Sequence, residues 1–233
     1  MLKRQISEWE CYPQSVRIIV VDDGSPEHAK PLIEAIASRQ LRARIELYRI
    51  MVDVPWNREE ARNLGAMQAH TQWIVQVDID HLLPADSATR LVQFDADTKH
   101  WYRFTRWRKG QADETRNKDA ISRNVLFGQI HPHVDSYLIS KRLYWLVGGY
   151  DLLFSGCLGG GSDFLKRLEA VAKPLMLPAQ IPLHVYTRSE VSDASDWSLN
   201  RDTSEGKRRA RIKRTAGAKA PSKPVVSKWE QQL

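Results

Sequence analysis

Two short acidic segments contain the residues of this chain that are best suited to chemistry. The first is Asp22-Asp23, which follows the apolar run 16–21 and precedes Gly24-Ser25. Adjacent carboxylates beyond a strand end can accept hydrogen bonds from ribose hydroxyls or base N–H groups. An Asp- and Gly-rich turn also forms between a strand and a helix without any ligand. The segment therefore leaves nucleotide binding and a plain turn open.

The second acidic segment is Asp78-Ile79-Asp80, at the end of the apolar run 73–77. An Asp-x-Asp pair at a strand end turns both carboxylates to one side. This arrangement suits a hard divalent cation, Mg²⁺ or Mn²⁺, bridged to phosphate oxygens. Asp-x-Asp is common by chance, so it is the matching acidic segment upstream that favours a site over two solvated turn residues.

Two single residues further along the chain are candidates for the same site. Asp163 follows the glycines of residues 159–161, where a carboxylate can act as a general base or simply cap the helix that begins there. His184 lies in the predicted strand 178–186, and alternation can place its imidazole on the ligand side. A structural role is the more common one for a lone histidine in a strand.

Two other segments carry ligand-binding residue types without a fixed role. His131 and His133 flank Pro132 and can ligate a metal, although nothing in their spacing requires it. Residues 101–109 interleave aromatic and basic side chains, which can stack on sugars or bases and contact phosphates. The alternative, which we favour, is an amphipathic edge strand with one apolar and one solvated side.

The elements that must position these residues follow from periodicity and from cap and turn signals. Apolar and β-branched runs predict strands over 16–21, 45–50, 73–77, 134–139 and 178–186, with an antiparallel edge strand over 101–108. Helical spacing and cap signals predict helices over 2–12, 27–40, 57–70, 140–147 and from the glycine loop to 172, with Asn57 and Glu60 forming a capping box, Ser140 as an N-cap and Gly148-Gly149 as a stop. This alternation predicts an α/β domain with a largely parallel sheet and flanking helices.

Composition excludes several classes of protein. The chain has 233 residues, of which 42% are hydrophobic and 27% charged, as in ordinary globular proteins. No apolar run approaches the ~20 residues that a membrane span requires, and Met1–Arg4 is not followed by the apolar core of a signal peptide. Two distant cysteines support neither a disulfide framework nor a structural zinc site. We therefore expect a cytoplasmic protein.

The net charge of +7 is unevenly distributed. Residues 207–228 contain nine Lys or Arg and no acid, which leaves 26 bases against 28 acids in the rest of the chain. We therefore expect a folded domain over 1–200 and a basic, mobile tail over 201–233. Such tails bind nucleic acid or anionic membranes, or only keep a protein soluble.

Three segments together resemble the inverting glycosyltransferases of family 2, which have the GT-A fold, a Rossmann-like α/β architecture. Those enzymes carry a Val-Asp-Asp-Gly-Ser strand end, an Ala-Arg-Asn-x-Gly helix and a strand that ends in Asp-x-Asp. The corresponding segments here are 21–25, 61–65 and 78–80, in the same order and at similar spacing. With Gly148-Gly149-Tyr150-Asp151 and the glycine loop, the resemblance covers residues 10–188.

The resemblance implies nucleotide-sugar-binding roles for four residues. Asp22 or Asp23 would hold the base and ribose, and Arg62 would lie beside the nucleotide. Asp78 would contact the ribose or the metal shell.

It also implies a metal site and a base. Asp80 would ligate Mn²⁺ or Mg²⁺, His184 would complete the metal site, and Asp163 would be the general base. The family has a Glu-Asp pair where this chain has Ser162-Asp163. The family also has a strand before its first helix, whereas the predicted elements here start with that helix, so we expect the sheet to lack this strand.

The implied function is a glycosyltransferase, hexosyl- or pentosyl-, that moves a sugar from a nucleotide-diphosphate sugar to an acceptor hydroxyl with inversion. The family favours a saccharide or glycan precursor as acceptor. DNA with a hydroxylated base is an alternative, because the basic tail and the 101–109 segment suit a polyanion. A non-catalytic nucleotide- or nucleic-acid-binding module is a third reading.

Overall fold

The computed structural model describes residues 1–52, 57–109, 129–155, 159–186 and 228–233. The α-helices in these ranges are α1 (Leu2–Trp9), α2 (Ala29–Ile36), α3 (Arg39–Arg42), α4 (Arg58–Gln68), α5 (Ala85–Val92), α6 (Lys141–Leu146) and α7 (Gly160–Glu169), with a 3₁₀ turn η1 at Leu152–Phe154. The strands are β1 (Ile18–Asp22), β2 (Ile45–Ile50), β3 (Trp73–Gln76), β4 (His81–Leu82), β5 (Trp101–Arg103), β6 (Arg106–Lys109), β7 (Gln129–Ile130), β8 (Tyr137–Ser140), β9 (Pro174–Met176), β10 (Leu183–Tyr186) and β11 (Trp229–Gln231).

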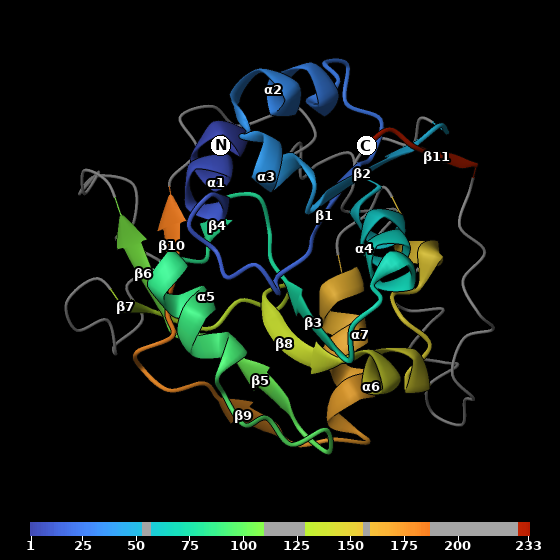
Figure 1. Cartoon of the computed structure of the whole chain (residues 1–233). Coiled ribbons are helices and arrows are strands. Elements are labelled where there is room, and N and C mark those ends of the chain that lie inside the picture. Colours follow the sequence, from blue (N-terminus) through green and yellow to red (C-terminus); the bar gives the residue numbers. More distant parts are fainter. Residues whose placement is uncertain (53–56, 110–128, 156–158, 187–227) are drawn as a thin grey trace, which may run out of the picture.

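The strands form three small sheets with the orders β1-β2-β11, β3-β8-β5-β9 and β4-β10-β6-β7. In Figure 1 the first lies at the upper right, the second in the lower centre and the third at the left. Strands β1 and β2 are parallel, as are β5 with β9 and β6 with β10, while the other pairs are antiparallel. The predicted α/β class is confirmed, with mixed rather than largely parallel pairing.

The first two sheets share the same two apolar layers. On one side, Val20 of β1 and Val75 of β3 pack against a core that includes residues of α1, α2 and α3. On the other, Ile19 of β1 and Ile74 of β3 pack against a core built from α4, α6 and α7. The result is a layered arrangement of helix, sheet and helix.

Within the described ranges, no strand joins these two sheets. Strand β1 is paired only with β2, and β3 only with β8. No strand therefore lies between β1 and β3 in the described residues. The outer edge of β2 is instead paired with β11, at the far end of the chain.

Two predicted strands differ from the observed ones. The predicted strand 101–108 is divided at the buried residue Phe104, so that β5 and β6 belong to different sheets. The predicted strand 178–186 is shorter, because Ile181 N–H closes a turn onto Pro178 C=O (2.9 Å) before β10 begins. Alternation identifies extended backbone, but it does not say which sheet the backbone joins.

Most helix signals agree with the structure. Ser140 Oγ accepts a hydrogen bond from Leu143 N–H at 3.2 Å and so caps α6, as predicted. Asn57 is the N-cap residue of α4, but its side chain donates to the Glu60 carboxylate and makes no hydrogen bond to the helix backbone. The predicted capping box is therefore replaced by a bond between the two side chains.

The predicted tail lies mainly outside the described residues, which exclude 187–227. Its last residues differ from the expected mobile arm. Met51 N–H donates to Lys228 C=O (2.8 Å), Gln232 N–H to Leu47 C=O (2.7 Å), and Leu233 packs against the core. Residues 228–233 are thus part of the folded body because β2 offers them an open sheet edge.

Candidate nucleotide and metal site

The Ala-Arg-Asn-x-Gly motif lies on α4, where three of its residues have separate contacts. Asn63 Oδ1 accepts hydrogen bonds from Tyr150 N–H (2.8 Å) and Tyr144 O–H (2.7 Å), and Asn63 Nδ2 donates to Tyr150 C=O (2.8 Å). A Cβ on Gly65 would stand 3.6 Å from Val21 Cγ2 of β1, at ordinary contact distance. The motif therefore fixes α4 against β1 and against the turn at Tyr150, which leaves Arg62 to face the strand ends.

Arg62 joins two carboxylates that come from different parts of the chain. Its guanidinium donates to Asp78 at the end of β3, and its Nη1 lies 3.5 Å from Asp135 Oδ1. The Arg62 side chain is 6% exposed and its plane lies over the Tyr150 ring, 5.2 Å from the centroid. Burial alone would raise the pKa of Asp78, but the charge of the Arg62 guanidinium lowers it. Asp78 is therefore held as a carboxylate.

Two histidines lie beside Asp78. Arg106 Nη1 is 3.0 Å from His81 Nε2, and Ser136 Oγ is 2.7 Å from His81 Nδ1. Since a guanidinium only donates, His81 Nε2 accepts and Nδ1–H donates to Ser136. Burial first, and then the charge of His133, lowers the pKa of His81 to about 4. Burial also lowers the pKa of His133, so both imidazoles are neutral and offer lone pairs.

Asp78, His81 and His133 form a group that could hold a metal ion. One ligand atom from each lies within 4.8 Å of the others, and His133 Nδ1 is 3.4 Å from Asp78 Oδ2. One carboxylate and two neutral imidazoles suit Mn²⁺ or Zn²⁺ better than Mg²⁺, which prefers oxygen ligands. The donor set fits a cation, provided that Arg62 and Arg106 release Asp78 and His81 when it binds.

The predicted metal ligands Asp80 and His184 are not among these three grouped residues. Tyr186 N–H donates to Asp80 C=O at 3.1 Å, so the pairing of β4 with β10 reaches Asp80. His184 is opposite Leu82 in this pairing, and side chains alternate along a strand. His184 therefore faces the opposite side of the sheet from His81, whereas Asp80 lies in the turn before β4, near enough for its charge to act on His81. The structure does not bring them into the Asp78 group, and their role stays a prediction.

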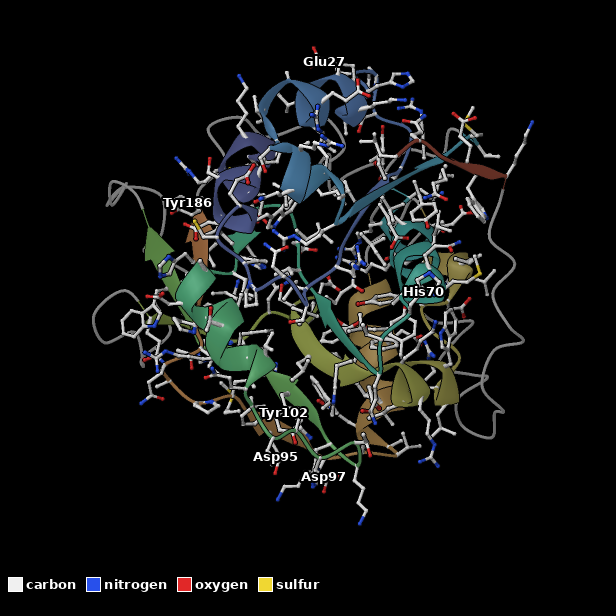
Figure 2. All side chains as sticks on the ribbon, viewed as in Figure 1. Glu27, His70, Asp95, Asp97, Tyr102 and Tyr186 are labelled. Atoms are coloured by element: carbon white, nitrogen blue, oxygen red, sulfur yellow. The ribbon has the colours of Figure 1, made fainter. Side chains whose placement is uncertain are left out.

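Tyr186 shows how that opposite side is covered. Tyr186 ends β10 beside α1 (Figure 2). The Arg4 guanidinium of α1 lies 4.0 Å from the centroid of its ring. Gln5 Nε2, on the same helix, donates to the carbonyls of Ile79 (3.0 Å) and His81 (2.9 Å). Helix α1 thus fixes the backbone of the Asp-x-Asp segment from this side.

The first acidic segment has a more local arrangement. Asp22 Oδ1 accepts hydrogen bonds from Gly24 N–H (3.1 Å) and Ser25 N–H (2.8 Å), and Asp22 Oδ2 is 2.5 Å from Arg49 Nη1. Asp22 therefore stabilises its own turn and pairs with β2. Asp23 is only partly buried, and nucleotide binding by either residue stays a prediction.

Asp163, the predicted base, lies in the first turn of α7. Its Oδ2 accepts a hydrogen bond from Arg167 Nε at 2.9 Å, and Arg167 also donates to Val147 C=O at the end of α6. Asp163 is a helix residue and not the N-cap, which is Gly159 with φ of 110°. Its catalytic role is not tested by these contacts.

Four residues of this site have no role that the sequence patterns assign. His133 is one of several possible ligands in the sequence, and His81 follows the Asp-x-Asp pair without belonging to it. Glu59 is fully buried beside Arg58, with Glu59 Oε1 3.1 Å from Arg58 Nε, and burial raises its pKa to about 7. Asp135 is 1% exposed and accepts from Tyr150 O–H at 3.0 Å. In the sequence, His133 is signalled only by the His-Pro-His segment 131–133, and Glu59 only by its place just before the 61–65 motif.

The fold and this site define an α/β domain with an arginine-bearing helix and an acidic strand end. A family model described as glycosyl transferase family 2 matches residues 2–150. The chain belongs to that family, as the motifs indicated. No curated protein sequence matches it.

Solved structures show the same fold at low identity. The S. aureus TarS 1–349 structure with UDP-GlcNAc has a TM-score of 0.59 at 14% identity, over 82% of this chain and 55% of that one. The structure of GalNAc-T7 with UDP, GalNAc and Mn²⁺ has a TM-score of 0.54 at 15% identity, over 75% of this chain and 38% of that one. This chain thus spans about half or less of these proteins, and the likeness shows a GT-A fold. No helix in the ranges described is both long and apolar enough to cross a membrane.

Proposed function

We propose that this protein transfers a sugar from a nucleotide-diphosphate sugar to an acceptor hydroxyl with inversion. The observation that carries the proposal is the contact of Arg62, from the family motif, with Asp78 at the end of β3. Arg58 and Arg106 lie beside the same group through Asp135 (3.4 Å) and His81 (3.0 Å). Three guanidinium groups around one strand end suit a diphosphate, because guanidinium binds phosphate oxygens with paired hydrogen bonds.

A divalent cation belongs to this proposal. Asp78, His81 and His133 are the ligand set that the geometry favours, and Asp80 with His184 is the set that the family resemblance favours. A bound cation would neutralise charge on the departing diphosphate. The chain's own residues hold the donor, with Asp22 or Asp23 toward the base and ribose and Arg62 toward the phosphates, and they align it with the acceptor.

The test is thermal unfolding of the full chain with UDP-GlcNAc, in Mn²⁺ and in EDTA. At 100 times Kd, a ligand that binds only the folded protein should raise Tm by roughly 5–10 °C. His133→Gln should remove most of the Mn²⁺-dependent part if the Asp78 group holds the cation, and Asp80→Asn should remove it if the other set does. Arg90→Gln, on the exposed face of α5, is the control. A wild-type chain that no UDP-, GDP- or TDP-sugar stabilises would contradict the proposal.

Asp163 is the proposed base that removes the proton of the acceptor hydroxyl as it attacks the anomeric carbon. Asp163→Asn should lower turnover by roughly 10²–10⁴ and change donor affinity by less than about threefold. Turnover is measured as release of nucleotide diphosphate with a saccharide acceptor mixture. Near-normal turnover in the variant would transfer the role to another residue, with Asp151 the next candidate.

The acceptor that we propose is a saccharide or glycan precursor. DNA is the second candidate, and the basic residues between 207 and 228 and the aromatic and basic segment 101–109 favour it. A hexosyl or a pentosyl donor is consistent with the site.

A further inference from the structure

Helices α4 and α7 meet at one buried carboxyl group. Glu59, in the first turn of α4, has no exposed surface. Its Oε1 is 3.1 Å from Arg58 Nε, whereas its Oε2 is buried and has no hydrogen-bond partner in the described part of the chain. A buried carboxyl with one unbonded oxygen destabilises the fold. We therefore expect Glu59 to have a role that offsets this cost.

The first turn of α7 lies directly on this group. A Cβ added to Gly160 would stand 2.3 Å from Glu59 Oε1 and 2.8 Å from Glu59 Cδ. A Cβ on the next residue, Gly161, would stand 2.2 Å from Asp135 Oδ1. Neither glycine has a positive φ, so what requires glycine here is the close approach of the helix backbone to two carboxyl groups.

This contact links the two halves of the proposed site. Arg62 lies three residues after Glu59 on α4, and Asp163 lies three residues after Gly160 on α7. Residues three apart in an α-helix are neighbours on adjacent turns. A displacement of the first turn of α7 therefore displaces Asp163 relative to the helix that carries Arg62.

We propose that Glu59 is a positioning residue for glycosyl transfer, whose side chain sets where the first turn of α7, and with it Asp163, lies against α4. The proposal rests on the proposed function. A carboxyl group suits this place because the amino end of a helix carries partial positive charge. Glutamate also has the length to reach α7 from α4, which aspartate lacks by one methylene.

The alternative is that Glu59 only contributes to folding. The two roles differ in what a compensating pair of substitutions does. Gly160→Ala places a methyl group where Glu59 now lies, and Glu59→Ala removes the carboxyl that the methyl would meet. If the contact positions α7, the double variant should restore what each single variant loses.

The experiment measures Tm, stabilisation by UDP-GlcNAc and the turnover number for UDP-GlcNAc hydrolysis in Mn²⁺, on the full chain. Gly160→Ala and Glu59→Ala should each lower turnover by roughly 10–100-fold, the effect of misplacing a reacting group by about 1 Å. Donor stabilisation should stay within about 2 °C of wild type. Glu59→Gln, which keeps the length and volume, should stay within about threefold of wild-type turnover. Glu169→Ala, the same substitution on the exposed side of α7, is the matched control.

The double variant decides the matter. Turnover within about fivefold of wild type in Glu59→Ala/Gly160→Ala supports the proposal, because one methyl group fills the space that the other change vacates. Losses that multiply, or single variants that lower Tm and leave turnover unchanged, overturn it. A failure of the proposed function is recognised separately, since wild type would then show neither donor stabilisation nor hydrolysis.

Discussion

The two acidic strand ends of this protein look alike in sequence and differ in structure. Asp22 ends β1 and Asp78 follows β3, and each is paired with an arginine from a neighbouring element. Asp22 accepts two hydrogen bonds within its own turn, from Gly24 N–H and Ser25 N–H. Asp78 instead contacts Arg62 of α4 and His133, from distant parts of the chain.

The Asp22 turn is a local motif, built mainly from neighbouring residues. The Asp78 group is the convergent region, because its residues come from distant parts of the chain. The Asp22 turn needs only its own residues and Arg49, so a short sequence is enough to form it. The Asp78 group exists only when β3, α4 and the segment before β8 have packed together. It is therefore the better candidate for a function that depends on the whole fold.

The strongest test of this comparison removes the arginine from each pair. Arg62→Ala leaves Asp78 and Asp135 without their shared cation and should destabilise the protein by about 3–5 kcal/mol. Arg49→Ala leaves Asp22 with its two backbone donors and should lower stability by about 1–2 kcal/mol. Urea unfolding measures both, with Arg90→Ala on the surface of α5 as control. Equal losses in the two variants would show that both arginines are equally structural.

Stability against pH sharpens the comparison, because only the convergent region contains a buried acid with a strongly raised pKa. Burial raises the pKa of Glu59 from 4.5 to about 7. The folded protein therefore holds a proton that the unfolded chain releases, and stability is lost as pH rises from about 4.5 to 7. Glu59→Gln should remove this loss and gain about 3 kcal/mol relative to wild type between pH 4.5 and 7.5.

The measurement is urea unfolding of wild type and Glu59→Gln at half-unit pH steps. Glu169→Gln, at an exposed position outside both regions, supplies the control slope. A difference between Glu59→Gln and wild type that does not change with pH would mean that Glu59 is charged throughout this range.

Substitutions in the basic tail should not alter the stability of either the Asp22 turn or the Asp78 group. Replacing the eight Lys and Arg residues between 207 and 223 by Ser should alter unfolding free energy by less than about 0.5 kcal/mol. If four to six of them neutralise phosphates, the slope of log affinity for duplex DNA against log salt should fall by roughly four to five. Keeping 228–233 preserves β11. Equal DNA binding before and after the change would favour the glycan acceptor.

Much of the fold was predictable because its signals are local. An apolar run followed by acids locates β1 and β3, and Ser140 and Gly148 mark the ends of α6 within a few residues each. The predicted strand 101–108 failed at Phe104, since alternation continues across a change of sheet. Pairing between β2 and β11 had no local signal at all.

The candidate site was predictable only in part, for the same reason. Asp78 and Arg62 belong to recognisable motifs. Asp135 and Glu59 do not, because an acid before a strand or in a first helical turn is ordinary. Their importance arises from the close approach of Gly160 to Glu59 and of Gly161 to Asp135. Gly160 lies about a hundred positions beyond Glu59 in the chain, so no local pattern signals this contact.

The pairing of β11 with β2 has a consequence for how the protein folds. Trp229 lies opposite Ile50, so this pairing closes a loop of roughly 180 residues. The loss of chain entropy is offset only when both strands are in place and their hydrogen bonds form. The strand should therefore dock late in folding and be the first to detach in native-state fluctuations. Amide exchange at Met51 and Gln232, whose N–H groups donate across this pairing, would then report on the integrity of this sheet edge.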